Sequence, residues 1–595
     1  MIKVSDYIAQ RLKEIYGVKT LFMVSGGGAM HLNDSFGKYI PYICNHHEQA
    51  CAIAAEGYAR VNQELAVVNI TTGPGGLNCL NGVFGQWTDS VPVLYVSGQV
   101  KTSTTIASCP EIKLRQLGDQ EVDIISVVKP LCKYAKMVKD PYEIGYILDK
   151  AVYLATHGRK GPTWIDVPID IQAAVIDETK LKKYDYKEDE LKLPEFKNEL
   201  SQLQALIAEA KRPILIAGHG ITISKSKDIF LELIEKLQIP VVTTMNGFDI
   251  IPENNQYFVG RIGTVANRAG NFALQNADLV ISIGSRNNIR QISYNWENFA
   301  KNAKLVMVDI DKAELDKPTL KPFLKIHADL AEFLPKFLSH CKQNKASQNA
   351  DWLSFCRHLK NKYPTLGEAK RVEHNPIEPY FFIQELTKCF SDDELVVGGN
   401  GTAFLLPFQV GIVKEKQRYI WNSGDASMGY DLPAAIGACI ANNNKRTVCL
   451  AGDGSIMMNL QELQTMKHYN LPIKLFVLNN NGYISIQQTQ KNFFQGRITA
   501  CSIDSGVSIP DFVEVGNAFG LKTVKISSLE NLQEQIKQVL DSDGPILCEV
   551  MLSPDYIFAP KLSARKLEDG TMVSPSLEDM FPFLDREEFE ENILK

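Results

Sequence analysis

The chain has 595 residues, of which 45% are hydrophobic, so at roughly 150 residues per domain we expect two to four domains with large packed cores. The formal net charge of -6 is small for this length and gives no sign of binding to nucleic acid or to a membrane surface. The start of the chain reads as an amphipathic helix rather than a signal peptide, no run of about 18 apolar residues predicts a membrane span, and the 12 scattered cysteines without metal-like spacing indicate reduced thiols in a cytoplasmic protein.

Short apolar strands alternate with helical patterns in three segments of the chain, which predicts an α/β protein. The expected fold class is three doubly wound domains, each built on a parallel sheet. We place the first domain at residues 1–180, the second at 195–345 and the third at 375–560. A linker rich in lysine and glutamate, at 179–199, separates the first two. Residues 561–595 form a C-terminal tail that we expect to act as a lid or a subunit contact.

The first segment places a single glutamate, Glu48, after two histidines and before an apolar run rich in alanine. Taken alone, this pattern indicates a glutamate at the N-terminus of a helix. This stretch alone does not explain why a carboxylate lies at the N-terminus of a helix that is expected to be buried.

The third segment carries the strongest signal. Asp453 follows the apolar run RTVCLA, and Asn480 follows the run KLFVL, 27 residues later. One helical crossover fits this separation, so both side chains should emerge at the carboxyl ends of neighbouring parallel strands, where α/β sheets bind ligands. With the carbonyl of Gly482 they offer hard oxygen ligands for Mg²⁺ or Ca²⁺, and Gly452 and Gly454 let the backbone approach a phosphate. For the glycine-rich motif alone, the alternative is a surface turn.

This pair of motifs resembles the cofactor motif of thiamine diphosphate (ThDP)-dependent enzymes. The similarity covers nearly the whole chain and points to acetolactate synthase large subunits, whose pattern the stretches ITTGPGGLN, DSVPVLYVSGQV, QEVDI and LPAAIGA match in order. The resemblance implies ThDP and Mg²⁺ as cofactors, with Asp453, Asn480 and Gly482 around the metal. It also implies that Asn400, Gly401 and Thr402 cradle the diphosphate of ThDP. The other cofactor-binding residues implied in these segments are Gly399, Gly452, Gly454, Ser455 and Tyr483.

The resemblance also gives Glu48 a role. It matches the glutamate that hydrogen-bonds the pyrimidine ring of ThDP and promotes removal of a proton from the thiazolium carbon, so Glu48 is the expected catalytic residue. The stretch NSGDASMGYDLPAAIGA matches the segment that holds and bends the cofactor. By this match the Ala426 carbonyl and the Met428 amide contact the ring, and the Met428 side chain wedges beneath the bend. Ordinary core packing is the alternative for Met428.

The middle segment resembles the FAD-binding domain of the same family. Glycine turns after strands can accommodate a dinucleotide, and arginine binds phosphate through two parallel hydrogen bonds. Related enzymes bind another nucleotide here or none, and that alternative stays open. We expect FAD in a structural role, since the reaction has no net redox step. The matching residues are Gly218, Gly220, Thr244, Arg286, Arg290, Asp309 and Asp329.

Three positions depart from acetolactate synthases. Asp119 replaces a phenylalanine, Ser485 a methionine and Thr489 a tryptophan, all on the side where the acceptor keto acid binds in that family. These changes remove the fit for a small alkyl ketone and offer hydrogen bonds instead. Ile486 occupies the place where pyruvate decarboxylases carry a proton-donating glutamate, which favours carbon–carbon ligation over aldehyde release. An alignment slip of one or two residues is the alternative.

We therefore expect decarboxylation of a 2-oxo acid, pyruvate being the first candidate, and transfer of the two-carbon unit to a polar ketone or aldehyde such as a nucleotide-linked keto-sugar. An acetolactate synthase of amino-acid biosynthesis and a decarboxylase that releases free aldehyde remain alternatives, as does a non-catalytic homologue that binds the cofactor. In the family the cofactor lies between the first domain of one chain and the third domain of another. The expected assembly is therefore a homodimer or homotetramer acting on small molecules, without nucleic acid or membrane.

Overall fold

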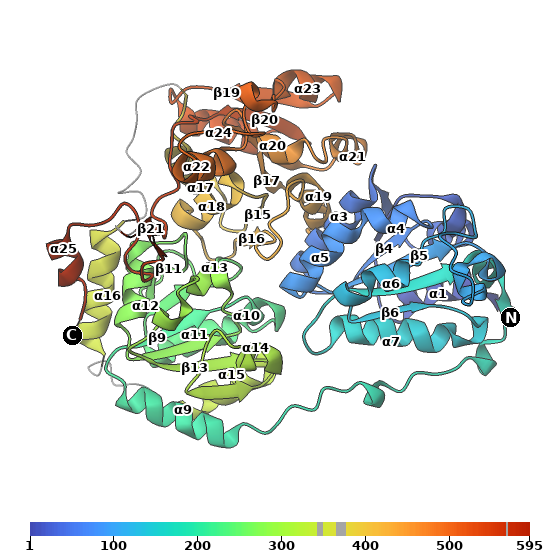
Figure 1. Cartoon of the computed structure of the whole chain (residues 1–595), viewed down its shortest axis with the longest axis horizontal. Helices are drawn as coiled ribbons and strands as arrows, with labels where there is room; N and C mark the ends of the chain where they lie inside the picture. Colours follow the sequence, from blue (N-terminus) through green and yellow to red (C-terminus); the bar gives the residue numbers. More distant parts are fainter. Residues whose placement is uncertain (342–348, 365–375, 567–568, 570, 595) are drawn as a thin grey trace.

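The computed structural model describes residues 1–341, 349–364, 376–566, 569 and 571–594. Within them lie three six-stranded sheets in which every strand pairs in parallel with its neighbours. Figure 1 shows each sheet with its own helices around it, the N-terminal sheet in blue to cyan, the middle sheet in green to yellow and the C-terminal sheet in orange. The predicted fold class, three doubly wound parallel sheets, is confirmed.

The N-terminal sheet has helices on both faces. Its strand order is β3-β2-β4-β5-β7-β6, with β2 Leu21–Met23, β3 Tyr42–Cys44, β4 Ala66–Ile70, β5 Val93–Gln99, β6 Tyr134–Met137 and β7 Thr163–Pro168. One face packs on α1 (Val4–Glu14), α2 (Met30–Tyr39) and α7 (Ile144–Thr156), and the other on α3 (Glu48–Asn62), α5 (Leu80–Asp89) and α6 (Ile124–Val128). Side chains alternate between the faces along a strand, so Leu94 joins the first core and Tyr95 the second.

The C-terminal sheet repeats the N-terminal one in topology. Its order is β16-β15-β17-β18-β20-β19, with β15 Leu395–Gly398, β16 Arg418–Ile420, β17 Thr447–Gly452, β18 Ile473–Asn479, β19 Lys522–Ile526 and β20 Ile546–Met551. In both sheets the second strand along the chain lies outside the first, and the last strand lies inside the one before it. Its longer helices are α17 Pro379–Cys389, α18 Thr402–Val410, α19 Asp431–Ala441, α21 Glu462–His468, α22 Ile484–Phe493, α23 Phe512–Ala518 and α24 Leu532–Leu540.

The middle sheet has a different order, β11-β10-β9-β12-β13-β14. Its strands are β9 Pro213–Ala217, β10 Val241–Thr243, β11 Phe258–Arg261, β12 Leu279–Ile283, β13 Lys304–Asp309 and β14 Leu324–His327. The chain reverses its winding between β9 and β12, and such switch points leave a crevice at the carboxyl ends of the strands. The helices of this region include α9 Lys197–Glu209, α10 Gly220–Ile223, α11 Lys227–Leu237, α12 Arg268–Asn276, α13 Ile289–Ile292, α14 Lys312–Asp316, α15 Leu330–His340 and α16 Ala350–Lys362.

Helices α3 and α19 join the N-terminal and C-terminal sheets of the same chain (Figure 1). Their backbones come so close that a Cβ on Gly57 would lie 2.1 Å from the carbonyl oxygen of Ala434, and one on Gly437 would lie 1.8 Å from that of Ala54. Only glycine fits at either position. The apolar run after Glu48 is therefore a buried contact between domains.

Two stretches of the chain cross between domains. The linker before α9 runs in an extended form from the N-terminal to the middle domain, and Figure 1 shows it along the lower edge of the molecule. The C-terminal tail, with α25 (Arg586–Glu591), packs on α12, where Asn271 Nδ2 donates to the Leu577 carbonyl at 2.9 Å and Asn276 Nδ2 to the Asn592 carbonyl at 2.8 Å. In the part of the chain that the structure describes, no helix is both long and apolar enough to cross a membrane.

Candidate functional site

Three loops of the C-terminal domain meet at the carboxyl ends of β15, β17 and β18, which are adjacent in the sheet. Asn400 and Gly401 follow β15, Asp453 follows β17 and Asn480 follows β18. The sheet changes its winding direction between β15 and β17, so these loops border a switch-point crevice. The structure thus brings the two motifs that the sequence singles out onto one edge of the sheet.

Asp453 is fixed by backbone amides rather than by a cation. Its Oδ1 accepts from the amide of Gly454 at 2.6 Å, and its Oδ2 accepts from the amides of Asn480 and Gly482 at 3.0 Å each. The side chain is 3% exposed, and burial raises the pKa of Asp453 to about 6 although these hydrogen bonds oppose the shift. Among the described residues no lysine or arginine pairs with it. A buried carboxylate of this kind suits a bound metal ion.

The amide group of Asn480 complements that carboxylate. Its Nδ2 donates to Thr402 Oγ1 at 3.1 Å, which leaves Oδ1 as the atom that can bind a cation. Gly482 has a φ of 130°, a conformation that favours glycine. Within the described residues no group of three His, Cys, Asp or Glu side chains forms a metal cluster. The available ligands are one carboxylate, one amide oxygen and one backbone carbonyl, hard oxygen donors that fit Mg²⁺ completed by a diphosphate.

The glycines of these loops differ in how much room they leave. A Cβ on Gly401, whose φ is 54°, would meet nothing within 4 Å, so space opens beside the start of α18. A Cβ on Gly454 would lie 2.1 Å from the ring of Tyr483. A Cβ on Gly399 would lie 2.7 Å from the carboxylate of Asp431. The free space thus lies at Gly401 and the N-terminus of α18, a position that favours a phosphate.

The Ser455 hydroxyl is already hydrogen-bonded within the protein. Its Oγ accepts from the amide of Gly429 at 2.9 Å and donates to Asp431 Oδ2 at 2.6 Å. The adjoining loop holds Ala426 at a φ of 57°, and its carbonyl accepts from Asn400 Nδ2 at 3.2 Å. Met428, in the same loop, is half-buried. The loop that carries Ala426 and Met428 is therefore tied to the loops after both β15 and β17.

Glu48 is the first residue of α3, behind the N-cap His47, whose Nδ1 accepts from the Gln49 amide at 3.1 Å. Its Oε2 accepts from Asn78 Nδ2 at 2.9 Å, and the side chain is half-exposed. Within the described residues of this one chain it forms no hydrogen bond to Asp453, Asn480 or the loop at 426–428. The single chain therefore leaves the Glu48 carboxylate partly exposed and apart from these loops.

Comparison with known proteins identifies the family of the chain. Three family models of thiamine pyrophosphate enzymes, the N-terminal TPP binding domain, the central domain and the C-terminal TPP binding domain, match residues 2–126, 200–337 and 400–550. The acetolactate synthase large subunit of Lactococcus lactis is 33% identical over 94% of both chains. Those of Cyanidium caldarium and of Escherichia coli isozyme 1 are 30% and 28% identical over at least 92% of each chain. The chain belongs to the acetolactate synthase family of ThDP enzymes. Its cofactor is ThDP, another name for thiamine pyrophosphate.

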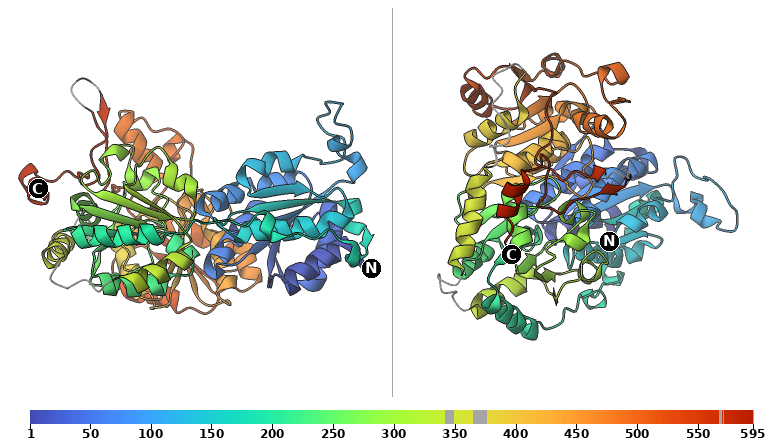
Figure 2. Two further views of the ribbon diagram at one scale, coloured as in Figure 1. Left: turned by 90° about the horizontal axis from the view of Figure 1, so that it is seen from below. Right: turned by 60° about the vertical axis from the view of Figure 1, so that its left-hand side comes forward.

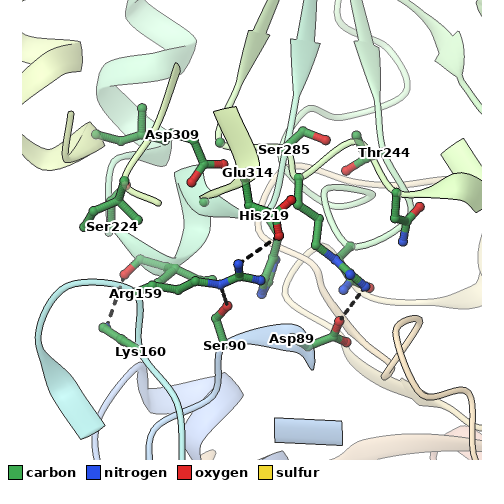
Figure 3. A pocket seen from close by; sticks show the side chains of 18 of the residues that line it. Asp89, Ser90, Arg159, Lys160, His219, Ser224, Thr244, Ser285, Asp309 and Glu314 are labelled. Carbon is green, nitrogen blue, oxygen red and sulfur yellow. Dashed lines mark hydrogen bonds and ion pairs between the residues drawn. The ribbon is translucent and has the colours of Figure 1, made fainter. Parts of the chain in front are cut away.

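This ThDP enzyme has a cavity of about 270 Å³ at the switch point of its middle sheet. Figure 3 shows side chains of the middle domain and of the N-terminal domain converging on it. Six of the seven residues predicted to bind FAD line it: Gly220, Thr244, Arg286, Arg290, Asp309 and Asp329. Gly218, the seventh, lies behind the wall, where a Cβ would be 2.3 Å from the carbonyl oxygen of Gly284. Gly218 thus serves the close approach of two strands.

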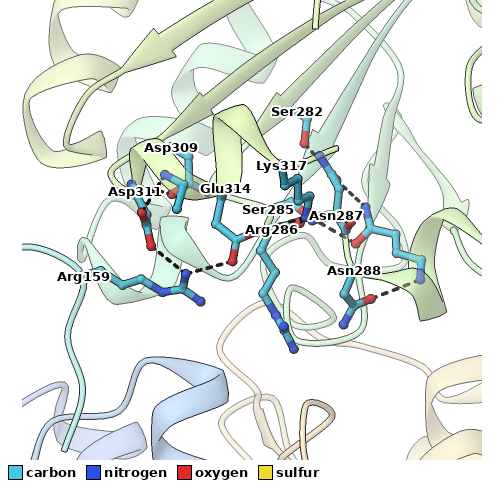
Figure 4. A network of polar contacts seen from close by, with 12 residues as sticks. Arg159, Ser282, Ser285, Arg286, Asn287, Asn288, Asp309, Asp311, Glu314 and Lys317 are labelled. Atoms are coloured by element: carbon cyan, nitrogen blue, oxygen red, sulfur yellow. Dashed lines mark hydrogen bonds and ion pairs between the residues drawn. The ribbon is translucent and has the colours of Figure 1, made fainter. Parts of the chain in front are cut away.

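The charges around this cavity suit an anionic dinucleotide. Arg290 pairs with no carboxylate among the described residues, and burial lowers its pKa. Arg286 lies 3.9 Å from Asp89 and, in Figure 4, extends away from Lys317 and the sheet. Burial raises the pKa of Asp309 to about 6 and lowers that of His219 to about 4. The Arg290 guanidinium, which has no carboxylate partner among the described residues, can donate to a diphosphate, and the carboxylates can accept from ribose hydroxyls, so the cavity fits FAD.

Two further cations, Arg159 and Lys160, line this cavity and were not predicted from the sequence. Arg159 Nη1 donates to Asp311 Oδ2 and to Glu314 Oε1, each at 2.8 Å, and lies between them in Figure 4. Both missed residues belong to the loop before β7 of the N-terminal domain. Their only sequence signal was a pair of cations between two glycines, which does not indicate a site in another domain.

The predicted acceptor residues fall on two separate elements. Asp119 is exposed on the segment at 101–120, which Figure 2 shows projecting from the N-terminal domain. Ser485, Ile486 and Thr489 are exposed on α22 of the C-terminal domain. Within one chain the structure does not bring Asp119 to α22, just as it does not bring Glu48 to Asp453.

Proposed function

We propose that this enzyme decarboxylates a 2-oxo acid, pyruvate in the first instance, and transfers the two-carbon unit to a polar ketone or aldehyde. The observation that carries the proposal is the polar character of the acceptor side, where Asp119, Ser485 and Thr489 stand at positions that acetolactate synthases fill with apolar side chains. Hydroxyl and carboxylate groups in the site stabilise a bound acceptor that forms hydrogen bonds with them. An alkyl acceptor binds more weakly because it leaves them unpaired. A nucleotide-linked keto-sugar is the acceptor class that fits best.

Mg²⁺ and the diphosphate of ThDP share one site in this proposal. The carboxylate of Asp453, Asn480 Oδ1 and the Gly482 carbonyl would hold the metal, and Gly401 and Thr402 would contact the diphosphate. What supports this is the buried carboxylate without a cationic partner and the open space beside Gly401. When bound, ThDP supplies the carbon atom that carries the two-carbon unit.

Glu48 is the catalytic residue of the proposal. Asn78 Nδ2 holds its Oε2 at 2.9 Å, which orients the carboxylate to exchange a proton with the pyrimidine ring. Ile486, on α22, offers no proton to the reacting carbon, which lets the acceptor compete with protonation. Met428 and the Ala426 carbonyl position the pyrimidine ring, supported by the hydrogen bond that ties Ala426 to Asn400.

The working unit of the proposal is a homodimer or a dimer of dimers in which each site combines two chains. Glu48 and Asp119 come from one chain, while Asp453 and α22 come from its partner. Support comes from the half-exposed Glu48 and from the exposed apolar side chains that surround these elements: Phe84, Trp87, Met457, Met458, Ile486 and Phe493. Exposed patches of this kind mark interfaces.

FAD bound in the middle cavity is the remaining part of the proposal. Arg290 would pair with its diphosphate, and the role would be structural because the overall reaction is redox-neutral. We also place the enzyme in the cytoplasm, because all 12 cysteines are free and most are buried.

The alternative function is acetolactate synthesis, which the names of the relatives favour. One assay separates the two. Pyruvate is offered with 2-oxobutyrate in one reaction and with hydroxylated keto compounds, including nucleotide-linked keto-sugars, in others. Extension of a sugar at a kcat/KM at least ~10-fold above that for 2-oxobutyrate is expected. Rapid formation of acetolactate and acetohydroxybutyrate with no sugar product would establish the alternative, and free aldehyde alone would indicate a decarboxylase.

A further inference from the structure

Tyr556 lies in the segment between β20 and the C-terminal tail and contacts the cofactor loops. It follows the last strand of the C-terminal sheet, β20, by five residues, and its side chain is only 8% exposed. Its hydroxyl lies 2.5 Å from Thr402 Oγ1, the first residue of α18. A residue of this segment thus touches the side chain that the family resemblance assigns to the diphosphate.

The hydrogen bonds of Thr402 show what this contact does. Asn480 Nδ2 donates to Thr402 Oγ1 at 3.1 Å, so one lone pair of that oxygen is used. A threonine hydroxyl accepts two hydrogen bonds and donates one. If Tyr556 donates to the second lone pair, the proton of Thr402 is left to point at an anion. Without the phenol, the same proton has no fixed direction.

A second contact holds Tyr556 in place. Gln488, on α22, donates from Nε2 to the Tyr556 carbonyl at 2.9 Å and accepts at Oε1 from the Phe558 amide at 3.2 Å. One side chain therefore clamps the backbone on both sides of Ile557. Phe558 also packs edge-on against the Tyr556 ring, with centroids 5.4 Å apart. The clamp fixes the backbone that carries the phenol, and the packing against Phe558 holds its ring.

We propose that Tyr556 is a positioning residue of the cofactor site, which directs the Thr402 hydroxyl toward the diphosphate of ThDP. The proposal rests on the proposed function through the place given to Thr402. It assigns to the segment after β20 a part in cofactor binding that none of the predicted motifs contains. Because Gln488 lies on α22, the same short segment links the cofactor loops to the helix that carries the acceptor residues.

The variant Tyr556→Phe tests this, because it removes one oxygen and keeps the ring that packs on Phe558. We expect the dissociation constant of ThDP, measured calorimetrically on apoenzyme with saturating Mg²⁺, to rise ~10-fold, equivalent to ~1.4 kcal/mol. At saturating ThDP, kcat should change less than ~2-fold, because Tyr556 touches neither substrate nor reacting atoms.

Tyr380→Phe is the matched control. Tyr380 is a buried tyrosine of the same cluster, its ring centroid 6.3 Å from that of Tyr556, and its hydroxyl donates to Gln409 Oε1 at 2.8 Å and accepts from the Ala559 amide at 2.9 Å. It should lower the melting temperature of apoenzyme and holoenzyme alike and leave ThDP affinity unchanged. An equal loss of ThDP affinity in both variants would mean that Tyr556 acts only through packing, and the proposal would fail.

Gln488→Ala provides a second route in case the tyrosine variant does not fold. It loosens the clamp without touching the phenol, and ThDP affinity should fall in the same direction by a smaller factor. Unchanged affinity in both Tyr556→Phe and Gln488→Ala would overturn the proposal. If instead the unmodified enzyme binds ThDP equally well with and without Mg²⁺, the metal site of the proposed function is wrong, whatever the tyrosine variant does.

Discussion

Asn480 and Asp453, 27 residues apart in sequence, are joined by a hydrogen bond of 3.0 Å from the backbone amide of Asn480 to Asp453 Oδ2. The bond exists because β17 and β18 are parallel neighbours that end together, with Gly452 opposite Leu478 in the register. It brings the Asp453 carboxylate next to the Asn480 side chain, and the backbone amide of Gly482 donates to the same oxygen. The metal and cofactor predictions depend on this relationship.

The first prediction concerns the metal. Asp453→Asn keeps the shape and the hydrogen-bonding capacity at Oδ1 but removes the charge, so Mg²⁺-dependent binding of ThDP should weaken by at least ~100-fold, about 2.7 kcal/mol. Calorimetric titration of ThDP with and without Mg²⁺ measures this. Asp504 is an exposed aspartate of the same domain, so Asp504→Asn should leave the Mg²⁺-dependent affinity for ThDP unchanged. Normal Mg²⁺-dependent affinity in Asp453→Asn would rule out Asp453 as a metal ligand.

The second prediction separates catalysis from binding. Glu48→Gln retains a hydrogen-bonding side chain beside Asn78, so ThDP should still bind, but turnover should fall at least ~100-fold because a positioned proton transfer contributes on that order. Turnover at saturating ThDP and ThDP affinity are measured on the same preparation. Glu64→Gln, at the exposed end of this region, is the control. Wild-type turnover in Glu48→Gln would be incompatible with its proposed role.

The third prediction tests whether each site spans two chains. Glu48→Gln and Asp453→Asn chains, each inactive alone, are unfolded, mixed and refolded together. If the two residues act across a twofold interface, half of the dimers are mixed and each mixed dimer has one intact site, giving about a quarter of wild-type activity. If each site lies within one chain, the mixture stays inactive. Light scattering on the same samples gives the oligomeric state.

The cofactor loops could be predicted from the sequence because their polar residues directly follow apolar runs that read as strands. Ligands of α/β proteins bind at the carboxyl ends of such parallel strands. The helix at Glu48 could be predicted, but not its contact with α19, because helical periodicity does not reveal which surface covers the helix. Gly57 and Gly437 mark that contact only once both backbones are seen. Arg159 and Tyr556 could not be predicted either, because each enters its site from a segment distant in sequence from the other residues of that site. The domain boundaries and the roles of the site residues remain predictions.

The fourth prediction concerns flavin. Arg290→Gln removes an unpaired guanidinium from the middle cavity, and a charge-assisted hydrogen bond is worth ~1.5–3 kcal/mol, so FAD should bind ~10- to 100-fold more weakly. The purified enzyme should be yellow and release flavin on denaturation, and the variant should be pale. Arg357→Gln, an exposed arginine that contacts only Gln256 among the described residues, is the control. A colourless wild-type enzyme that takes up no added FAD would refute flavin binding.

The last prediction concerns the acceptor. Asp119→Phe combined with Thr489→Trp restores apolar side chains at two positions that the proposal places in one site, on α22 and on the projecting segment of the partner. Alkyl acceptors then gain buried contact, and hydroxylated acceptors lose their hydrogen-bond partners at ~1–3 kcal/mol for each group left unpaired. The kcat/KM ratio of hydroxylated acceptors to 2-oxobutyrate should fall at least ~10-fold, which requires only ~1.4 kcal/mol. Competition assays with pyruvate as the donor measure the ratio directly.

Glu111→Phe is the control for this variant, because it adds the same aromatic ring to the same projecting segment at another exposed position. It should leave the ratio unchanged if the effect depends on the place of Asp119 rather than on the apolar character of the segment. A shift of equal size in Glu111→Phe would show that the segment acts through its overall surface. No shift in the double variant would remove Asp119 and Thr489 from the acceptor site, and the enzyme would then have to select its acceptor through other residues, of which Ser485 is the first to test.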